Sequence, residues 1–404
     1  MNQRDVHSVE WSNGRRQEWE KDMVIVEGTS TARFEPVRAA LAAHLESCEE
    51  LGASIAVDVD GVMEVDLWGG HADEARTVPW HQDTLVSLWS TTKTLSSLAA
   101  LVLVDRGALD LHRPVAHYWP EFAAQGKRDI EVRHVLSHTS GLSGWQQPFT
   151  IDDLYDWPTA SARLAAQAPW WEPGSASGYH VQTQGQLVGE LVRRVSGRTL
   201  TEFVDTEIAK PSQADVQIGA RQADWPRIAE LVAPSQLPGM PAGLDPEGIF
   251  TKTLLGSPAR DEHVDTPQWR RAELGAVNGH GNARGMARAL SVISRRGQVN
   301  GLRLLSADTV DKVLDVQADG IDLFLGVPVR WGIGFALADA RTMPHMPTGR
   351  VCFWVGRGGS IVMMDLDRRV TFSYTMNRLG DGILGSERTH SYIRHVYEVL
   401  DSTS

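Results

Sequence analysis

The sequence predicts an α+β fold in which one β-sheet is built from both ends of the chain. Segments rich in β-branched and aromatic residues occur near the N-terminus and again near the C-terminus of the 404 residues. The middle of the chain carries helical periodicity and many Pro and Gly residues. We therefore expect a polar leader at 1–30, a sheet domain made from 31–108 and 327–404, and a mostly helical domain at 109–326, with the active site between the two domains.

The N-terminal part predicts a helix followed by a hairpin. Apolar residues at fourfold spacing indicate an amphipathic helix over Pro36–Glu50. Two β-rich segments, Ala53–Asp58 and Val62–Trp68, flank the dipeptide Asp60-Gly61. This dipeptide favours the positive φ angles of a tight hairpin turn.

The hydrophobic period changes to that of a helix from Ser90 onward, and Gly107 stands where a left-handed C-cap is expected. Ser90 therefore lies at or near a helix N-terminus. Further helices are expected over Gly185–Val195 and Ala283–Arg295. The later elements are expected to be four strands and a final helix: Arg330–Leu337, Val351–Val355, Ser360–Asp365, Val370–Met376 and Arg388–Leu400.

Composition excludes several functional classes. The net charge of -12 without a Lys/Arg block argues against nucleic-acid and anionic-membrane partners. Only Cys48 and Cys352 are present, so neither a disulfide framework nor a zinc module is indicated, and we expect no metal and no cofactor. Met1–Lys21 lacks the apolar region of a secretion signal, and the run Leu95–Val104 is too short to cross a bilayer. We expect a cytoplasmic protein. The oligomeric state, a homo-oligomer included, stays open.

A hydroxyl and an amine stand three residues apart at Ser90 and Lys93, which makes them neighbours on one helix face. A serine becomes a good nucleophile when a base takes its proton, and a lysine can be that base when burial lowers its pKa. The positive helix end would also stabilise charge on a substrate carbonyl oxygen. Alone this short pattern is weak evidence, because Ser90 could equally be an N-cap in a solvent-facing first turn.

Further motifs follow in the sequence. They are Ser137–Leu142, Trp170–Tyr179, Asn278-Gly279-His280 and the glycine-rich run Trp354–Ser360. Successive glycines on a strand allow a ligand to approach the backbone closely. With Ser90 and Lys93, these motifs resemble the serine β-lactamase and penicillin-binding-protein superfamily, and specifically its class C-like branch with the family VIII carboxylesterases. The resemblance covers about Ala53 to Leu400 and implies a β-lactamase/transpeptidase-like fold.

The resemblance also implies roles for single residues. Ser90 would be the nucleophile, Lys93 its base, and Tyr179 the group that relays a proton to the leaving alcohol and later deprotonates the attacking water. The backbone N–H groups of Ser90 and Arg357 would form the oxyanion hole. The substrate-binding residues would be Trp354, Gly356, Gly358, His180, Trp170 and Trp171.

Two departures from the antibiotic-degrading members point to another substrate. Those enzymes carry Tyr-x-Asn, whereas this chain has Tyr179-His180-Val181. They also carry Lys-Thr-Gly on the late strand, where this chain has Trp354-Val355-Gly356. An indole in place of the cation favours a neutral, apolar ester, a lactone or an aromatic ester over a β-lactam.

Several of these residues have a plain structural interpretation. Without its flanking motif Tyr179 would be taken as a half-buried core tyrosine. We interpret His138 as a buried, hydrogen-bonded histidine that braces the fold, and His280 similarly. The family usually has a small residue at position 357. The Arg357 side chain could bind an acidic substrate, but we expect it to point to solvent.

The sequence therefore predicts a serine carboxylesterase-type hydrolase that works through an acyl-enzyme on Ser90 and acts on a small ester or lactone. An acyltransferase or a weak β-lactamase of the same family is the first alternative. A non-catalytic ligand-binding protein on this fold is the alternative of another class. Neither a G-x-S-x-G nucleophile elbow nor an H-E-x-x-H metal motif occurs in the chain.

Overall fold

A nine-stranded antiparallel sheet joins the two ends of the chain in the computed structural model, which describes residues 25–234 and 243–402. The strand order is β1-β3-β2-β14-β13-β12-β11-β10-β9. In that order the strands are Val26–Ser30, Val62–Gly70, Gly52–Val59, Val370–Met376, Ile361–Asp365, Val351–Val355, Ala336–Leu337, Pro328–Trp331 and Ala318–Ile321. The predicted α+β class with a sheet from both termini is confirmed.

The pairing of β2 with β14 is the seam between the two ends, and it runs from Ala53 opposite Met376 to Val59 opposite Val370. The predicted hairpin between β2 and β3 is confirmed, with positive φ angles of 51° at Asp60 and 89° at Gly61.

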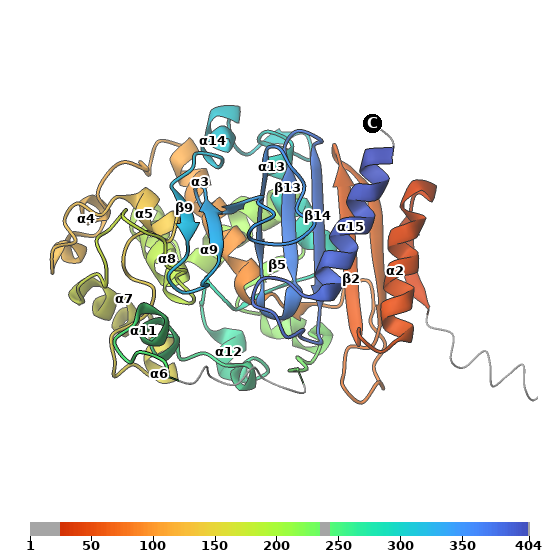
Figure 1. Ribbon diagram of the computed structural model, residues 1–404, viewed down its shortest axis with the longest axis horizontal. Coiled ribbons are helices and arrows are strands. Elements are labelled where there is room, and N and C mark those ends of the chain that lie inside the picture. The colour runs from red at the N-terminus through yellow and green to blue at the C-terminus, as the bar shows by residue number, and fades with distance from the viewer. Residues whose placement is uncertain (1–24, 235–242, 403–404) are drawn as a thin grey trace, which may run out of the picture.

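Helices cover both faces of this sheet (Figure 1). On one face α2 and α15 lie side by side, and α13 packs against β2, β13 and β14 on the other. The remaining helices gather mainly beyond the β9 end of the sheet. The α-helices are α2 Glu35–Glu46, α3 Thr92–Asp105, α4 Val115–Tyr118, α5 Val132–Leu136, α6 Ile151–Tyr155, α7 Trp157–Ala166, α8 Thr183–Ser196, α9 Leu200–Val204, α10 Lys210–Ser212, α11 Ile249–Leu255, α12 Pro267–Arg271, α13 Ala283–Ser294, α14 Ala307–Lys312 and α15 Glu387–Ser402.

Two small sheets complete the fold and were not expected from the sequence. One has the order β4-β6-β5, with strands Val86–Ser87, Gly279–Gly281 and Val216–Ile218. The other pairs Gln298–Val299 (β7) with Leu302–Arg303 (β8). The three-stranded sheet bears on function, because its strand β4 ends shortly before Ser90.

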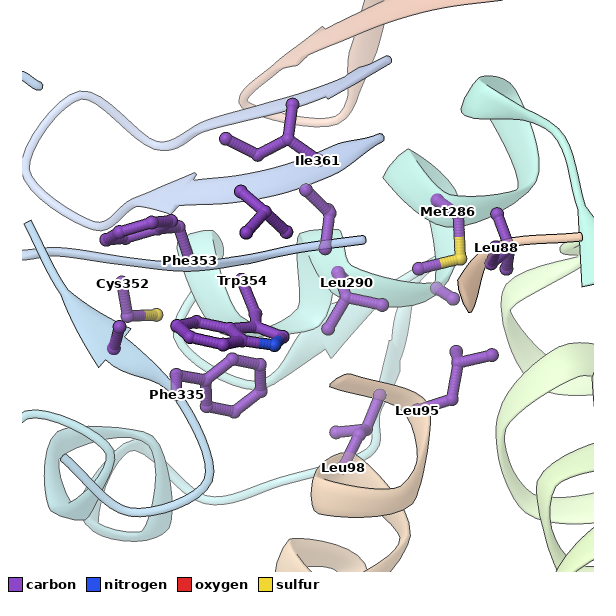
Figure 2. Close-up of a cluster of buried hydrophobic side chains, with 14 of the residues drawn as sticks. Leu88, Leu95, Leu98, Met286, Leu290, Phe335, Cys352, Phe353, Trp354 and Ile361 are labelled. Atoms are coloured by element: carbon purple, nitrogen blue, oxygen red, sulfur yellow. The ribbon is translucent and has the colours of Figure 1, made fainter. Parts of the chain in front are cut away.

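The helix α3 lies inside the molecule, with Leu95, Leu98 and Val102 fully buried. Figure 2 shows how side chains of α3 and α13 meet the side chains of β12 in one apolar cluster that includes Trp354. Every residue of α3 from Thr92 to Leu103 is buried, polar side chains included, so the helix is packed on all sides. In the described residues no helix is both long and apolar enough to cross a membrane.

Four sequence predictions need correction. Of the predicted leader 1–30, residues 1–24 lie outside the described part, and Val26–Ser30 form the edge strand β1. The helix expected over 36–50 ends at Glu46. The strand expected over 330–337 is two strands, β10 and β11, because Gly334 turns the chain with φ at 83°. The sheet takes in β9 before the predicted boundary at 327.

A buried ion pair ties the C-terminal helix to the loop after α2. Arg388 of α15 pairs with Glu50, whose side chain also accepts hydrogen bonds from Tyr374 and Tyr392. Glu50 is 1% exposed. The two charges are therefore compensated inside the protein, and removal of one leaves the other unpaired.

We expect Glu50→Ala to lower the free energy of unfolding by about 3–5 kcal/mol, because Arg388 would stay buried without its counter-charge. Urea unfolding measures this. The exposed neighbour Glu49 is the control, and Glu49→Ala should change the same quantity by about 0.5 kcal/mol or less. Equal effects of the two substitutions would contradict the importance of the pair.

Candidate active site

Ser90 lies in a tight turn between β4 and α3. A one-turn 3-10 helix, Trp89–Thr91, carries it and runs directly into α3. Trp89 has φ at 47°, a left-handed conformation that costs a non-glycine residue about 1–3 kcal/mol. The Leu88 N–H donates to Gly279 O of β6 at 2.8 Å, so the neighbouring sheet holds the turn. The expected place of Ser90 near a helix N-terminus is confirmed.

Lys93 stands in the first turn of α3 with its amine directed at Ser90. Its Nζ is 3.2 Å from Ser90 Oγ and donates to Val181 O at 2.7 Å and to Ala276 O at 3.1 Å. A neutral amine has two N–H groups and one lone pair, whereas a carbonyl only accepts. With both N–H groups on carbonyls, the lone pair of a neutral Lys93 faces the Ser90 hydroxyl.

Burial sets the charge of this amine. Lys93 is 2% exposed, and the loss of hydration lowers its pKa well below the usual 10.5. In the part of the chain that the structure describes, no carboxylate forms an ion pair with it that would restore the charge. Lys93 is therefore suited to accept the proton of Ser90.

Tyr179 presents its hydroxyl to the same point. It is 3% exposed, its hydroxyl interacts with Ser90, and the Lys93 Nζ lies 4.7 Å from its ring centre. Burial raises the pKa of Tyr179, so its phenol stays protonated at neutral pH. Trp354 Nε1–H donates to the phenol oxygen at 3.0 Å. The hydroxyl therefore keeps its own proton to donate.

The buried carboxylate of Asp322 fixes the position of Tyr179. Its Oδ1 accepts the N–H of Tyr179 at 2.9 Å and that of Phe324 at 3.0 Å. Its Oδ2 accepts Trp331 Nε1–H at 3.2 Å. The Trp331 ring lies parallel to Tyr179 at 6.1 Å between centres. Backbone and ring of Tyr179 are thus held by the same acid.

Two neutral histidines support this loop from behind. His138 Nδ1 accepts the backbone N–H of His180 at 3.1 Å. The His180 ring has Gly178 O at 2.6 Å from Nδ1 and Ser140 Oγ at 2.7 Å from Nε2. Burial lowers the pKa of His138 well below its usual value and that of His180 to about 3. Both act structurally, as expected for His138, and fully buried His180 does not reach the substrate cavity expected for it.

A cavity of about 670 Å³ opens above Ser90. Its lining is mostly apolar, with a group of charged residues at one side. The described lining residues are Trp89, Ser90, Tyr179, Val181, Gln182, Leu231, Ala233, Leu254, Ser257, Ala259, Arg260, Asp261, Glu262, Asp265, Val277, Phe324, Trp354, Val355, Arg357 and Ile383. Of the predicted pocket residues, the structure thus places Trp354 beside Ser90 and Tyr179.

The two glycines after Trp354 shape the turn instead of lining the cavity. A Cβ on Gly356 would come within 2.3 Å of Ser360 Oγ, and Gly358 has φ at 80° against the side chain of Leu379. Arg357 stands between them at the start of a 3-10 helix, where N–H groups have no partner within the helix. This placement is compatible with the predicted oxyanion hole, which stays a prediction.

The predicted pocket residues Trp170 and Trp171 lie outside the lining of the cavity. Trp171 Nε1–H donates to Ala176 O at 3.0 Å, and its ring fills the space beside Gly178. Trp170 packs at Gly144. Both indoles pack around the loop before Tyr179.

The Arg357 side chain corrects a sequence prediction. The sequence predicts that it points to solvent, but it forms a bidentate ion pair with Asp261 in the lining of the cavity. The partner is 96 residues away in the sequence, so no local pattern could indicate it.

Sequence reasoning also missed Trp89, Phe324, Asp261 and Asp322. The first three line the cavity and the fourth positions Tyr179. Asp322 is an ordinary acid in the sequence, 143 residues from Tyr179, and no motif marks it. In residues 25–234 and 243–402 no group of three His, Cys, Asp or Glu side chains is placed to hold a metal ion.

The family follows from a comparison with known sequences. A family model described as Beta-lactamase matches residues 37–391. The chain belongs to the beta-lactamase family. Within this family it is similar to "Esterase/beta-lactamase LipL" of Mycobacterium tuberculosis, with 33% identity over 366 residues, 87% of this chain and 83% of the relative.

Comparison with solved structures supports the membership of this chain in the beta-lactamase family. A family VIII carboxylesterase superposes with a TM-score of 0.87 at 34% identity, covering 93% of this chain and 100% of the other. A penicillin-binding-protein homologue from Caulobacter crescentus gives 0.86 at 34% identity with the same coverage. The predicted β-lactamase/transpeptidase-like fold and the family resemblance are confirmed.

We expect fluorophosphonate labelling of Ser90 to slow as the pH falls through the lowered pKa of Lys93, because protonation removes the accepting lone pair. The midpoint should lie well below 10.5. Lys93→Arg should abolish labelling, since a guanidinium stays protonated. Mass spectrometry of the labelled protein measures both.

Lys252→Arg, at a partly exposed lysine, is the control and should label at the wild-type rate. Wild-type labelling of Lys93→Arg would show that another group activates Ser90.

Proposed function

We propose that this protein is a serine carboxylesterase that cleaves uncharged apolar esters or lactones through an acyl-enzyme on Ser90. The observation that carries the proposal is the Lys93 amine, whose pKa is lowered by burial, 3.2 Å from Ser90 Oγ at the base of a mostly apolar cavity. A pocket that only binds ligands has no need of a buried amine facing a hydroxyl.

In the acylation half, Lys93 Nζ accepts the proton of Ser90 while Oγ attacks the ester carbonyl. The N–H groups of Ser90 and Arg357 hold the oxyanion that forms. When the oxyanion collapses, the C–O bond to the alcohol breaks. The leaving alkoxide takes the proton of the Tyr179 hydroxyl, and the protonated Lys93 amine then returns a proton to the Tyr179 oxygen.

In the deacylation half, water takes the place of the alcohol. As the water attacks the acyl carbonyl, the Tyr179 oxygen accepts a proton from it and passes its own proton to the neutral Lys93 amine. Lys93 returns this proton to Ser90 Oγ when the acid leaves. In both halves Trp354 Nε1–H, 3.0 Å from the phenol oxygen, stabilises the oxygen while its proton is shared. The arrangement therefore runs both steps with the same groups.

The cavity lining supports an uncharged substrate. Trp354 and Val181 line the cavity with Ser90. In the class C-like β-lactamases that the sequence resembles, a lysine stands at the position of Trp354 and an asparagine at that of Val181. Val181 offers its backbone oxygen to Lys93 and an apolar side chain to the cavity. A substrate carboxylate would meet no cation at position 354.

The relatives support the same reaction class. The names of two of them, the LipL protein of Mycobacterium tuberculosis and the family VIII carboxylesterase, include esterase activity. The first name also includes beta-lactamase. A lactam is therefore the competing substrate to test.

We expect p-nitrophenyl esters of short and medium acyl chains to be hydrolysed with a higher kcat/KM than a chromogenic cephalosporin, because the indole of Trp354 replaces a cation. Spectrophotometric rates across a chain-length series measure this. Ser90→Ala, which removes one oxygen, should abolish both activities. Faster turnover of the cephalosporin would contradict the esterase proposal.

Trp354→Phe tests the indole N–H, because it keeps an aromatic ring and removes the donor to Tyr179. We expect kcat to fall about tenfold with KM nearly unchanged, since one hydrogen bond to a reacting group contributes ~1.5 kcal/mol and 1.36 kcal/mol is tenfold in rate. Trp331→Phe is the matched control, because its N–H bonds Asp322 and not the phenol. Equal effects of the two substitutions on kcat would contradict a role for the Trp354 donor.

A further inference from the structure

The ion pair between Arg357 and Asp261 brings two opposite charges together in the wall of the cavity that holds Ser90. Arg357 Nε–H donates to Asp261 Oδ1 and Nη2–H to Oδ2, each at 2.6 Å. The side chains are 31% and 17% exposed. This parallel two-bond geometry is the strongest form of an arginine–carboxylate contact.

Asp261 is held in place by its own segment of the wall. Just before it, Ala259 exchanges two hydrogen bonds of 3.2 Å with the side-chain amide of Gln182, in the loop after Tyr179. Arg260 Nη1–H donates to Ala259 O at 2.8 Å. The carboxylate therefore meets Arg357 from a segment that is tied to the catalytic loop.

An unpaired guanidinium here would be a binding site for a substrate carboxylate, because its planar donors match two carboxylate oxygens. Asp261 occupies those donors. A substrate that carries a carboxylate would have to displace Asp261 and would then leave that acid unpaired in the cavity wall, which costs free energy.

We propose that Asp261 masks Arg357 and thereby makes this cavity select uncharged esters over anionic ones. This inference rests on the proposed esterase function and names a determinant of its specificity. Arg357 and Asp261 together contribute no net charge, so neither side chain offers a free charge to a substrate.

The neighbouring acid Glu262 offers a matched control. It lines the same cavity, but its side chain is 80% exposed, and its ion pair is with His263, at 4.0 Å, whereas Arg357 pairs with Asp261. Asp261→Asn and Glu262→Gln therefore change the net charge equally, whereas only the first frees the guanidinium from its counter-charge.

The test compares kcat/KM for p-nitrophenyl butyrate with that for mono-p-nitrophenyl succinate, which adds a carboxylate. In Asp261→Asn we expect the succinate-to-butyrate ratio to rise about tenfold at low salt and the gain to shrink at high salt, where charges are screened. In Glu262→Gln the ratio should change by about twofold or less. Equal changes in the two variants would overturn the masking role.

A second variant keeps the inference testable if Asp261→Asn fails to fold. Arg357→Gln keeps the backbone N–H and leaves Asp261 unpaired, so the ratio of butyrylthiocholine to p-nitrophenyl butyrate turnover should rise about fivefold. No rise would overturn the masking role. If the wild-type protein hydrolyses no ester at all, the proposed function is contradicted. If the wild type is active but the substrate ratios of the variants do not change, only the masking inference is contradicted.

Discussion

The chemistry that we propose for this protein depends on the removal of one lysine from water. Lys93 lies between Ser90 and two backbone carbonyls, those of Val181 and Ala276, and hydration is lost on every side. Without a carboxylate partner in the described residues, burial lowers the pKa of Lys93 and favours the neutral amine over what an exposed lysine would show. In the mechanism that we propose, the fold makes a base from a residue that is normally a cation, and the buried helix α3 carries it away from water.

The remaining groups of the site are arranged around that amine by contacts between distant segments. Tyr179 is held through Asp322 and receives the indole N–H of Trp354, so the loop after β9 and the strand β12 together fix one phenol. Preorganised donors and rings of this kind do not have to reorient during the reaction, which is how an enzyme stabilises developing charge. The backbone of Trp89 can keep its left-handed conformation because the neighbouring sheet holds the turn through a hydrogen bond.

Charge in the cavity is controlled by pairing. Arg357 would make the cavity attractive to anions, but Asp261 from the facing segment neutralises it. With Trp354 in place of a cation on β12, the surroundings of Ser90 present apolar surface and fixed dipoles. The substrate class that we propose follows from this balance and does not follow from the nucleophile, which is common to the family.

The sequence by itself determined the elements and the chemical groups that local patterns encode. The hairpin at Asp60-Gly61, the helix after Ser90 and the family roles of Lys93 and Tyr179 depend on short-range spacing or on motif order, both of which are visible in one dimension. The tertiary structure alone decided what surrounds those groups. The pKa of Lys93 depends on burial, and the masking of Arg357 depends on Asp261, an acid 96 residues away. Desolvation and ion pairing act through space, so no local sequence pattern can specify them.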